Sequence, residues 1–101
     1  MTHLPIACAL DPADLTTRRE TLLPGLAAQA LSRDLLPDGM RWQFAPTEEV
    51  LERITRVIDA ERRCCPFLRF ELTVEPDGGP LLLAATGPTG TREFLDALTR
   101  K

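Results

Sequence analysis

Three cysteines are the residues of this 101-residue chain best suited to chemistry: Cys8 stands alone, and Cys64 and Cys65 are adjacent. Thiolates are soft ligands that select Hg(II), Cu(I), Zn(II) and, by the same logic, trivalent arsenic. Two adjacent cysteines give two ligands from one backbone segment, whereas structural zinc motifs space theirs by two to four residues. The pattern therefore favours a three-thiolate site for a thiophilic metal or metalloid ion.

Glu61 adds a carboxylate one helical turn before the vicinal pair, on a helix face that is otherwise apolar. It could be an oxygen ligand, a proton acceptor or a residue that orients the site. The alternative is an ion pair with an arginine such as Arg19 or Arg41. The candidate metal ligands are thus Cys8, Glu61, Cys64 and Cys65.

The electrostatics of the vicinal pair favour metal binding over thiol-disulfide catalysis. A helix C-terminus carries partial negative charge and disfavours a thiolate, and helical spacing points Arg62 and Arg63 sideways. A metal ion overrides this effect because it deprotonates the thiols that coordinate it. The only histidine, His3, is close to the chain terminus, which argues against a mixed Cys/His zinc site.

Hydrophobic periodicity predicts the elements that position these residues. The clearest is a helix that follows Thr47, carries Val50, Ile54 and Val57 on one face, and stops before Pro66. Alternation or turn signals predict the other elements. They are a strand over 4–10 with Cys8 facing the core, a helix from residue 11 to about 33 interrupted at 24–25, a strand over 40–44, a hairpin of strands over 68–74 and 81–85, and a short helix over 94–98.

This order, β-α-β-α-β-β-α, predicts a single α+β domain over residues 1–101, with two layers, a four-stranded mixed sheet and helices mainly on one face. A thioredoxin- or glutaredoxin-like fold is the alternative. It is disfavoured because the chain lacks Cys-x-x-Cys after the first strand, and because Arg69, Glu71 and Glu75 require a solvated face. If strand 4–10 pairs with strand 68–74, the three sulfurs converge where the long helix ends.

The run Leu81–Leu83 is apolar on both sides of its strand, so a second subunit or the terminal helix is expected to cover the extra face. A homodimer is therefore one expectation of the sequence.

Composition limits the classes of function. The chain is 44% hydrophobic and 27% charged, as expected for a packed globular protein. Its net charge is −3 and its basic residues are scattered, which argues against a nucleic-acid partner. No signal peptide or membrane-spanning run is recognisable, so the expected location is the cytoplasm, where cysteines are normally reduced.

The stretch from Glu61 to Phe70, with Pro5–Cys8 upstream and Gly87-Pro88 downstream, resembles a group of small uncharacterised bacterial proteins associated with mercury- and other heavy-metal-resistance gene clusters. The specific motif is Glu-x-x-Cys-Cys-Pro-Phe together with the early cysteine. The resemblance implies a context of metal resistance and raises the same four residues as candidates; it implies no mechanism.

Three functions follow from these observations. The first is binding of a thiophilic metal or metalloid (Hg, Cu, Zn or As class) in metal resistance or homeostasis. The second is a thiol-redox enzyme with Cys64 or Cys65 as nucleophile. The third is a structural or dimerisation module whose cysteines are inert core residues. The sequence favours the first, in which the protein binds an ion and is not an enzyme.

Overall fold

The structure, a computed structural model, describes residues 22–99. Within them the chain forms three helices and four strands, and none of these helices combines the length and apolar character that a membrane span requires. In chain order the elements are α2 (Leu23–Ala27), β1 (Ser32–Leu36), β2 (Gly39–Phe44), α3 (Glu48–Cys64), β3 (Arg69–Val74), β4 (Leu81–Thr86) and α4 (Thr91–Thr99).

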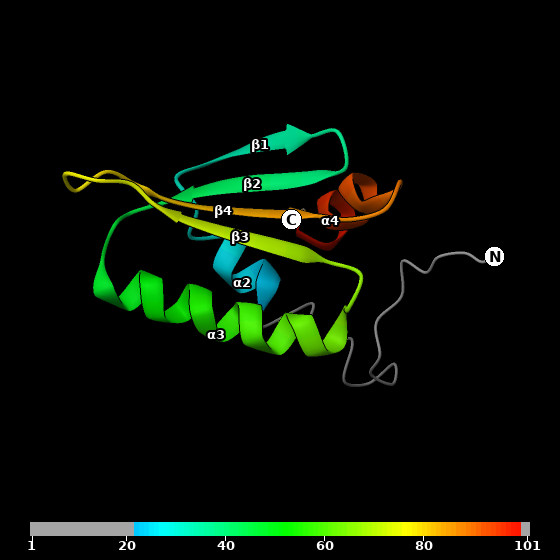
Figure 1. Cartoon of the computed structure of the whole chain (residues 1–101), viewed down its shortest axis with the longest axis horizontal. Helices are drawn as coiled ribbons and strands as arrows, with labels where there is room; N and C mark the ends of the chain where they lie inside the picture. Colours follow the sequence, from blue (N-terminus) through cyan, green and yellow to red (C-terminus); the bar gives the residue numbers. More distant parts are fainter. Residues whose placement is uncertain (1–21, 100–101) are drawn as a thin grey trace.

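The four strands form one sheet in the order β1-β2-β4-β3 (Figure 1). Every pairing among the described strands is antiparallel, so the α+β class with four strands is confirmed, and the described part of the sheet is antiparallel and not mixed as predicted. The thioredoxin-like alternative is also wrong for the described residues, because β3 lies at the edge of this sheet and not at its centre. The expected strand over 4–10 lies outside the described residues.

The largest difference from the prediction lies between residues 22 and 36. Of the expected long helix, the described residues contain only the short helix α2, which has Pro24 in its first turn. The next residues form β1, which pairs with β2 through a tight turn at 37–38. Four of the five β1 residues are exposed, so backbone pairing with β2 and not a buried apolar pattern defines this strand.

Helix α3 agrees with the prediction at both ends. Thr47 caps it, with its Oγ1 accepting a hydrogen bond from the Val50 amide at 3.2 Å, and Glu48 and Glu49 lie in the first turn where the dipole favours negative charge. The helix ends at Cys64, two residues before Pro66. The element that carries the candidate site is therefore encoded locally.

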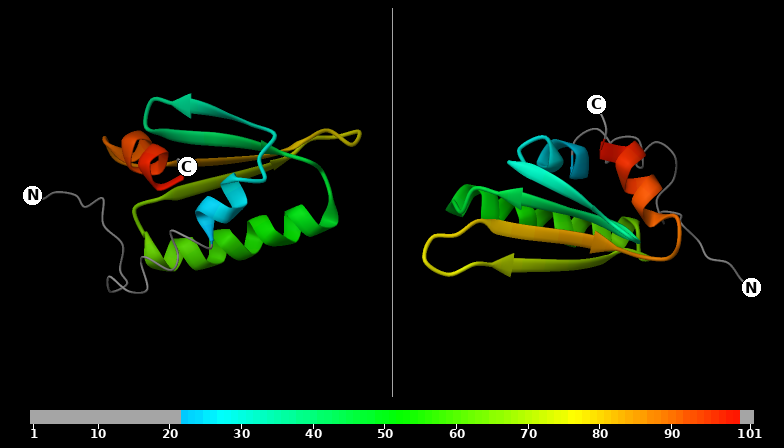
Figure 2. Two further views of the ribbon diagram at one scale, coloured as in Figure 1. Left: turned by 180° about the vertical axis from the view of Figure 1, so that it is seen from behind. Right: turned by 90° about the horizontal axis from the view of Figure 1, so that it is seen from above.

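The two faces of the sheet have different environments. One face contributes buried side chains to the core, among them Met40, Trp42 and Leu83, and α2, α3 and α4 all lie on that side (Figures 1 and 2). The opposite face carries exposed Arg41 and half-buried Leu82. The terminal helix does not cover Leu82 as one alternative proposed, since α4 packs beside β2 on the core side.

A substitution of Gly39 tests how closely β2 approaches β4 at this position. A Cβ at this position would lie 2.0 Å from the Ala85 carbonyl oxygen, which is backbone and cannot move aside cheaply. We expect Gly39→Ala to lower the free energy of unfolding by about 3 kcal/mol. The measurement is urea unfolding followed by fluorescence of Trp42, the single tryptophan, which is buried.

Gly25→Ala is the matched control. Among the atoms of residues 22–99, its Cβ would approach none closer than the flexible Arg53 guanidinium, at 3.7 Å, and alanine favours a helix by roughly 0.5–1 kcal/mol. We expect this variant to be neutral or slightly stabilised. Equal destabilisation of the two variants would contradict the packing argument.

Candidate functional site

The C-terminal turn of α3 brings the candidate residues to one side of the helix. The buried positions of α3 are Ile54, Val57, Glu61 and Cys64, which follow one another by three or four residues and form one stripe. Cys65 is the first residue beyond the helix, and its amide donates a hydrogen bond to the Glu61 carbonyl at 2.6 Å. This bond holds Cys65 directly next to the last turn.

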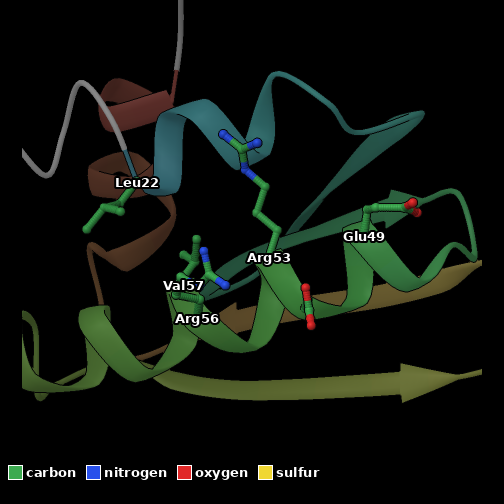
Figure 3. Close-up of a pocket in the computed structure, with 6 residues that line it drawn as sticks. Leu22, Glu49, Arg53, Arg56 and Val57 are labelled. Atoms are coloured by element: carbon green, nitrogen blue, oxygen red, sulfur yellow. The ribbon is translucent and has the colours of Figure 1, made fainter.

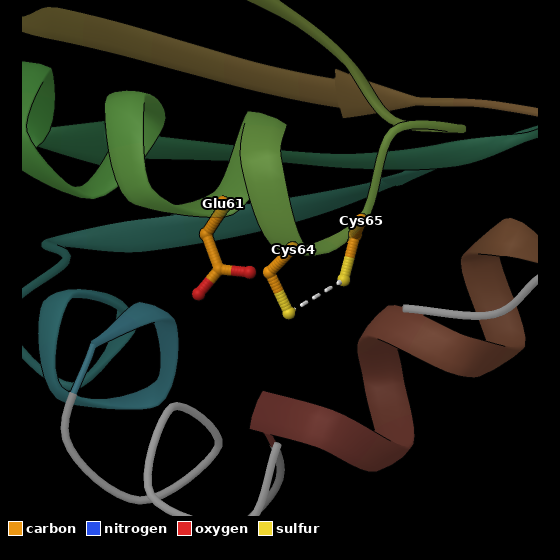
Figure 4. Close-up of side chains that lie close together, drawn as sticks. All are labelled: Glu61, Cys64 and Cys65. Carbon is orange, nitrogen blue, oxygen red and sulfur yellow. Dashed lines mark hydrogen bonds between the residues drawn. The ribbon is translucent and has the colours of Figure 1, made fainter. Parts of the chain in front are cut away.

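Glu61, Cys64 and Cys65 form a compact, buried cluster. A carboxylate oxygen and the two sulfurs all lie within 4.8 Å of one another. The three residues are only 2%, 1% and 2% exposed, and the Sγ atoms of the two cysteines lie 3.7 Å apart (Figure 4). The structure thus brings together three of the four predicted ligands. Cys8, the fourth, lies outside the described residues.

The chain after the cluster is held by a turn and by an aromatic contact. The Leu68 amide donates a hydrogen bond to the Cys65 carbonyl at 3.0 Å, which closes a turn around Pro66 and Phe67. The ring of Phe67 packs edge-to-face on Phe94 of α4, with centroids 5.4 Å apart. The aromatic contact links the segment that follows Cys65 to α4.

The two arginines before the cysteines do not serve the site. Both bind Asp59, Arg62 through a contact of 2.8 Å and Arg63 through 2.5 Å, and all three side chains are exposed. The hydrogen bond from Arg62, followed by the charges of both arginines, holds the pKa of Asp59 below its usual value. The predicted sideways direction of Arg62 and Arg63 is therefore confirmed.

The alternative ion pair of Glu61 with Arg41 is wrong. Arg41 lies on the opposite, exposed face of the sheet and contacts Asp34 at 3.0 Å. Arg19, the other arginine considered for this role, lies outside the described residues.

The two cysteines of the pair differ in oxidation state. Cys65 is disulfide-bonded, whereas Cys64 is not. Their sulfurs are far beyond the S–S bond length of about 2.05 Å, so the two residues are not bonded to each other. The expectation of three reduced thiols thus does not hold for Cys65 in this structure, and sequence reasoning had no signal for the difference.

A pocket elsewhere on the described surface has a lining that differs from the cysteine cluster. An open pocket of about 400 Å³ lies beside the first half of α3 and is lined by Leu22, Val57 and charged side chains, with Glu49, Arg53 and Arg56 among them (Figure 3). It contains both signs of charge and none of the predicted ligands. The vicinal cysteines and Glu61 therefore remain the candidate site.

The arrangement combines two soft donors with one hard donor in a water-poor environment. A cysteine alone in such a core is often an inert small hydrophobe. A buried carboxylate is different, because its burial costs free energy unless a partner compensates it. The presence of Glu61 within 4.8 Å of both sulfurs distinguishes this cluster from ordinary core packing.

Comparisons of the chain with protein-family models, with curated proteins and with solved structures give no match.

A substitution of Gly87 tests how closely the chain around the candidate site is packed. A Cβ here would lie 2.6 Å from the Thr91 hydroxyl oxygen and 3.0 Å from the Phe67 carbonyl oxygen, in the turn after Cys65. We expect Gly87→Ala to lower the free energy of unfolding by about 1–3 kcal/mol, as overpacking does. Urea unfolding checks this, and an effect below about 0.5 kcal/mol, the range of ordinary surface substitutions, would show that the turn yields freely.

Proposed function

We propose that the reduced protein binds a thiophilic metal or metalloid ion, of the Hg, Cu, Zn or As class, in metal resistance or homeostasis. Cys64 and Cys65 supply two thiolates and Glu61 a carboxylate oxygen. Cys8, which lies outside the described residues, is proposed as the third thiolate. The ion is the protein's cargo, and the protein acts as a binding module without a catalytic residue.

The observation that carries the proposal is the convergence of three buried donors within 4.8 Å. Sulfur donors select soft ions over Mg²⁺ and Ca²⁺, which prefer oxygen ligands. The resemblance to proteins of heavy-metal-resistance clusters supports the same class of ion.

The proposed location is the cytoplasm. Glutathione and thioredoxin keep thiols reduced there, and the proposed ligand set requires Cys65 as a thiolate. Metal binding also needs deprotonated sulfur, which the ion itself promotes at the negative end of α3.

The disulfide at Cys65 is the specific observation that favours the second candidate, a thiol-redox function. Against a redox enzyme stands the position of the pair at a helix C-terminus, since nucleophilic cysteines of oxidoreductases lie at helix N-termini or beside cations. The two arginines that precede the cysteines in sequence are bound to Asp59 instead. The geometry therefore supports ion binding better than catalysis.

A homodimer through the outer face of the sheet is part of the proposal. Arg41 on β2 and Glu71 on β3 flank the small Ala84 on β4, in one row across the strands. A twofold axis parallel to β4 between two such faces would place Arg41 of each copy over the partner's Glu71. Within the described part of the chain, Arg41 pairs with Asp34 and Glu71 with Arg69 in exposed ion pairs, which are weak enough to exchange.

The first test of the function is binding of Cd(II) or Hg(II) to the reduced full chain. We expect a thiolate-to-metal ultraviolet band and, at 100 times the dissociation constant, a stabilisation of about 2.7 kcal/mol. Cys64→Ser and Cys65→Ser should both lose the band, because each removes a thiolate.

Glu61→Gln and Glu52→Gln are a matched pair on the same helix. Glu61 is buried in the cluster, whereas Glu52 is exposed. We expect Glu61→Gln to weaken ion binding by about 10- to 100-fold and Glu52→Gln to leave it unchanged. Absence of binding to the reduced wild type, or unaltered binding in Cys64→Ser, would refute the proposed function.

The dimer is tested by a charge exchange. Arg41→Glu should place like charges opposite each other and give a monomer by light scattering, and Arg41→Glu/Glu71→Arg should restore the dimer. The proposed interface would be contradicted by a wild type that is monomeric at concentrations of tens of micromolar, or by a dimer that persists in Arg41→Glu.

A further inference from the structure

Four charged side chains on the first half of α3 have the spacing of ion pairs without forming them. Glu49 precedes Arg53 by four residues and Glu52 precedes Arg56 by four, which is the spacing and the direction that favour ion pairs along a helix. Among residues 22–99, however, the ion pairs of α3 lie at its other end, around Asp59. The described part of the chain therefore leaves the charges of the first half available for a ligand.

These side chains line the pocket of about 400 Å³ beside α3, together with Leu22 and Val57. Figure 3 shows Arg53 extending from α3 toward α2, whereas the Glu49 carboxylate is turned away from it. The Arg53 guanidinium comes so close to α2 that a Cβ on Gly25 would lie 3.7 Å from it. The pocket is thus bounded by α2 and α3, and its positive and negative groups are separated along α3.

The lining combines opposite charges with apolar surface. Its two arginines and two glutamates cancel, so a simple anion or a simple cation would be attracted by one pair and repelled by the other. A zwitterion suits both, because its carboxylate accepts charge-assisted hydrogen bonds from a guanidinium and its ammonium donates them to a carboxylate. Buried Val57 and half-buried Leu22 offer apolar contact to the uncharged part of such a molecule.

We propose that this pocket binds a small zwitterion with an apolar side chain, of the class of the free aliphatic α-amino acids. Arg53 and Arg56 bind its carboxylate, and Glu49 or Glu52 binds its ammonium. The volume lies near the lower end of the range for small-molecule sites, about 300–1,000 Å³, as a ligand of this size requires. Among residues 22–99 the ligand displaces no ion pair of these side chains, which lowers the cost of binding.

This inference goes beyond the proposed function, because the pocket and the cysteine cluster share no residue. Binding of an amino acid here therefore stands or falls without regard to the binding of a metal ion.

The test is isothermal titration calorimetry of the full chain with L-leucine and three analogues that each lack one feature. N-acetyl-leucine lacks the ammonium, leucine amide lacks the carboxylate, and glycine lacks the apolar side chain. We expect leucine to saturate the protein at millimolar concentrations or below. Each analogue should bind about 10-fold more weakly or worse, because each loses either a charge-assisted contact or the apolar burial.

Substitutions on α3 locate the site. Arg53→Gln and Arg56→Gln should each weaken leucine binding by about 10-fold, since each removes a charged hydrogen-bond donor. Arg62→Gln is the matched control, an exposed arginine of the same helix outside the pocket, and should bind as the wild type does. All three arginines are exposed, so the urea midpoints should remain close to that of the wild type and a loss of binding cannot be ascribed to unfolding.

Three results would overturn the inference. They are a wild type that binds no leucine at millimolar concentrations, equal affinity for leucine and N-acetyl-leucine, and undiminished binding in the double variant Arg53→Gln/Arg56→Gln.

Discussion

The packing of a single stripe of α3 into the core is the constraint on which the rest of the structure depends. Ile54 and Val57 occupy the same stripe as Glu61 and Cys64, so the apolar burial of the first half of the helix fixes the direction of the polar donors in its last turn. Pro66 then forces the chain out of helical geometry. The apolar packing that stabilises α3 therefore also determines the direction in which the side chains of the candidate site point.

Burial changes the strength of the interactions that this cluster can make. A carboxylate and two sulfurs lie within 4.8 Å of one another, each almost fully excluded from water, inside an apolar core. Low polarity strengthens any interaction between an ion and these donors and raises the cost of leaving them uncompensated.

The sequence predicted α3 well because periodicity, capping and a terminal proline all agree over Glu48–Cys64. It failed at Ser32–Leu36, because it continued the long helix to about residue 33 and gave no strand there, whereas strand pairing with β2 overrides a weak local preference. The vicinal thiols and Glu61 were predicted from helical spacing, and that spacing is a local property. The disulfide state of Cys65 was not, since periodicity carries no information on oxidation state.

Adjacency in sequence does not make Cys64 and Cys65 equivalent. The helix holds Cys64 through the stripe it shares with Val57, whereas Cys65 is held by its amide bond to Glu61 and by the turn to Leu68. Both side chains nevertheless lie in the packed core, since Cys64 is 1% and Cys65 2% exposed, so a change in bonding at either residue disturbs its neighbours. The two cysteines therefore differ in their backbone support, helical for Cys64 and a cap with a turn for Cys65, and not in their burial.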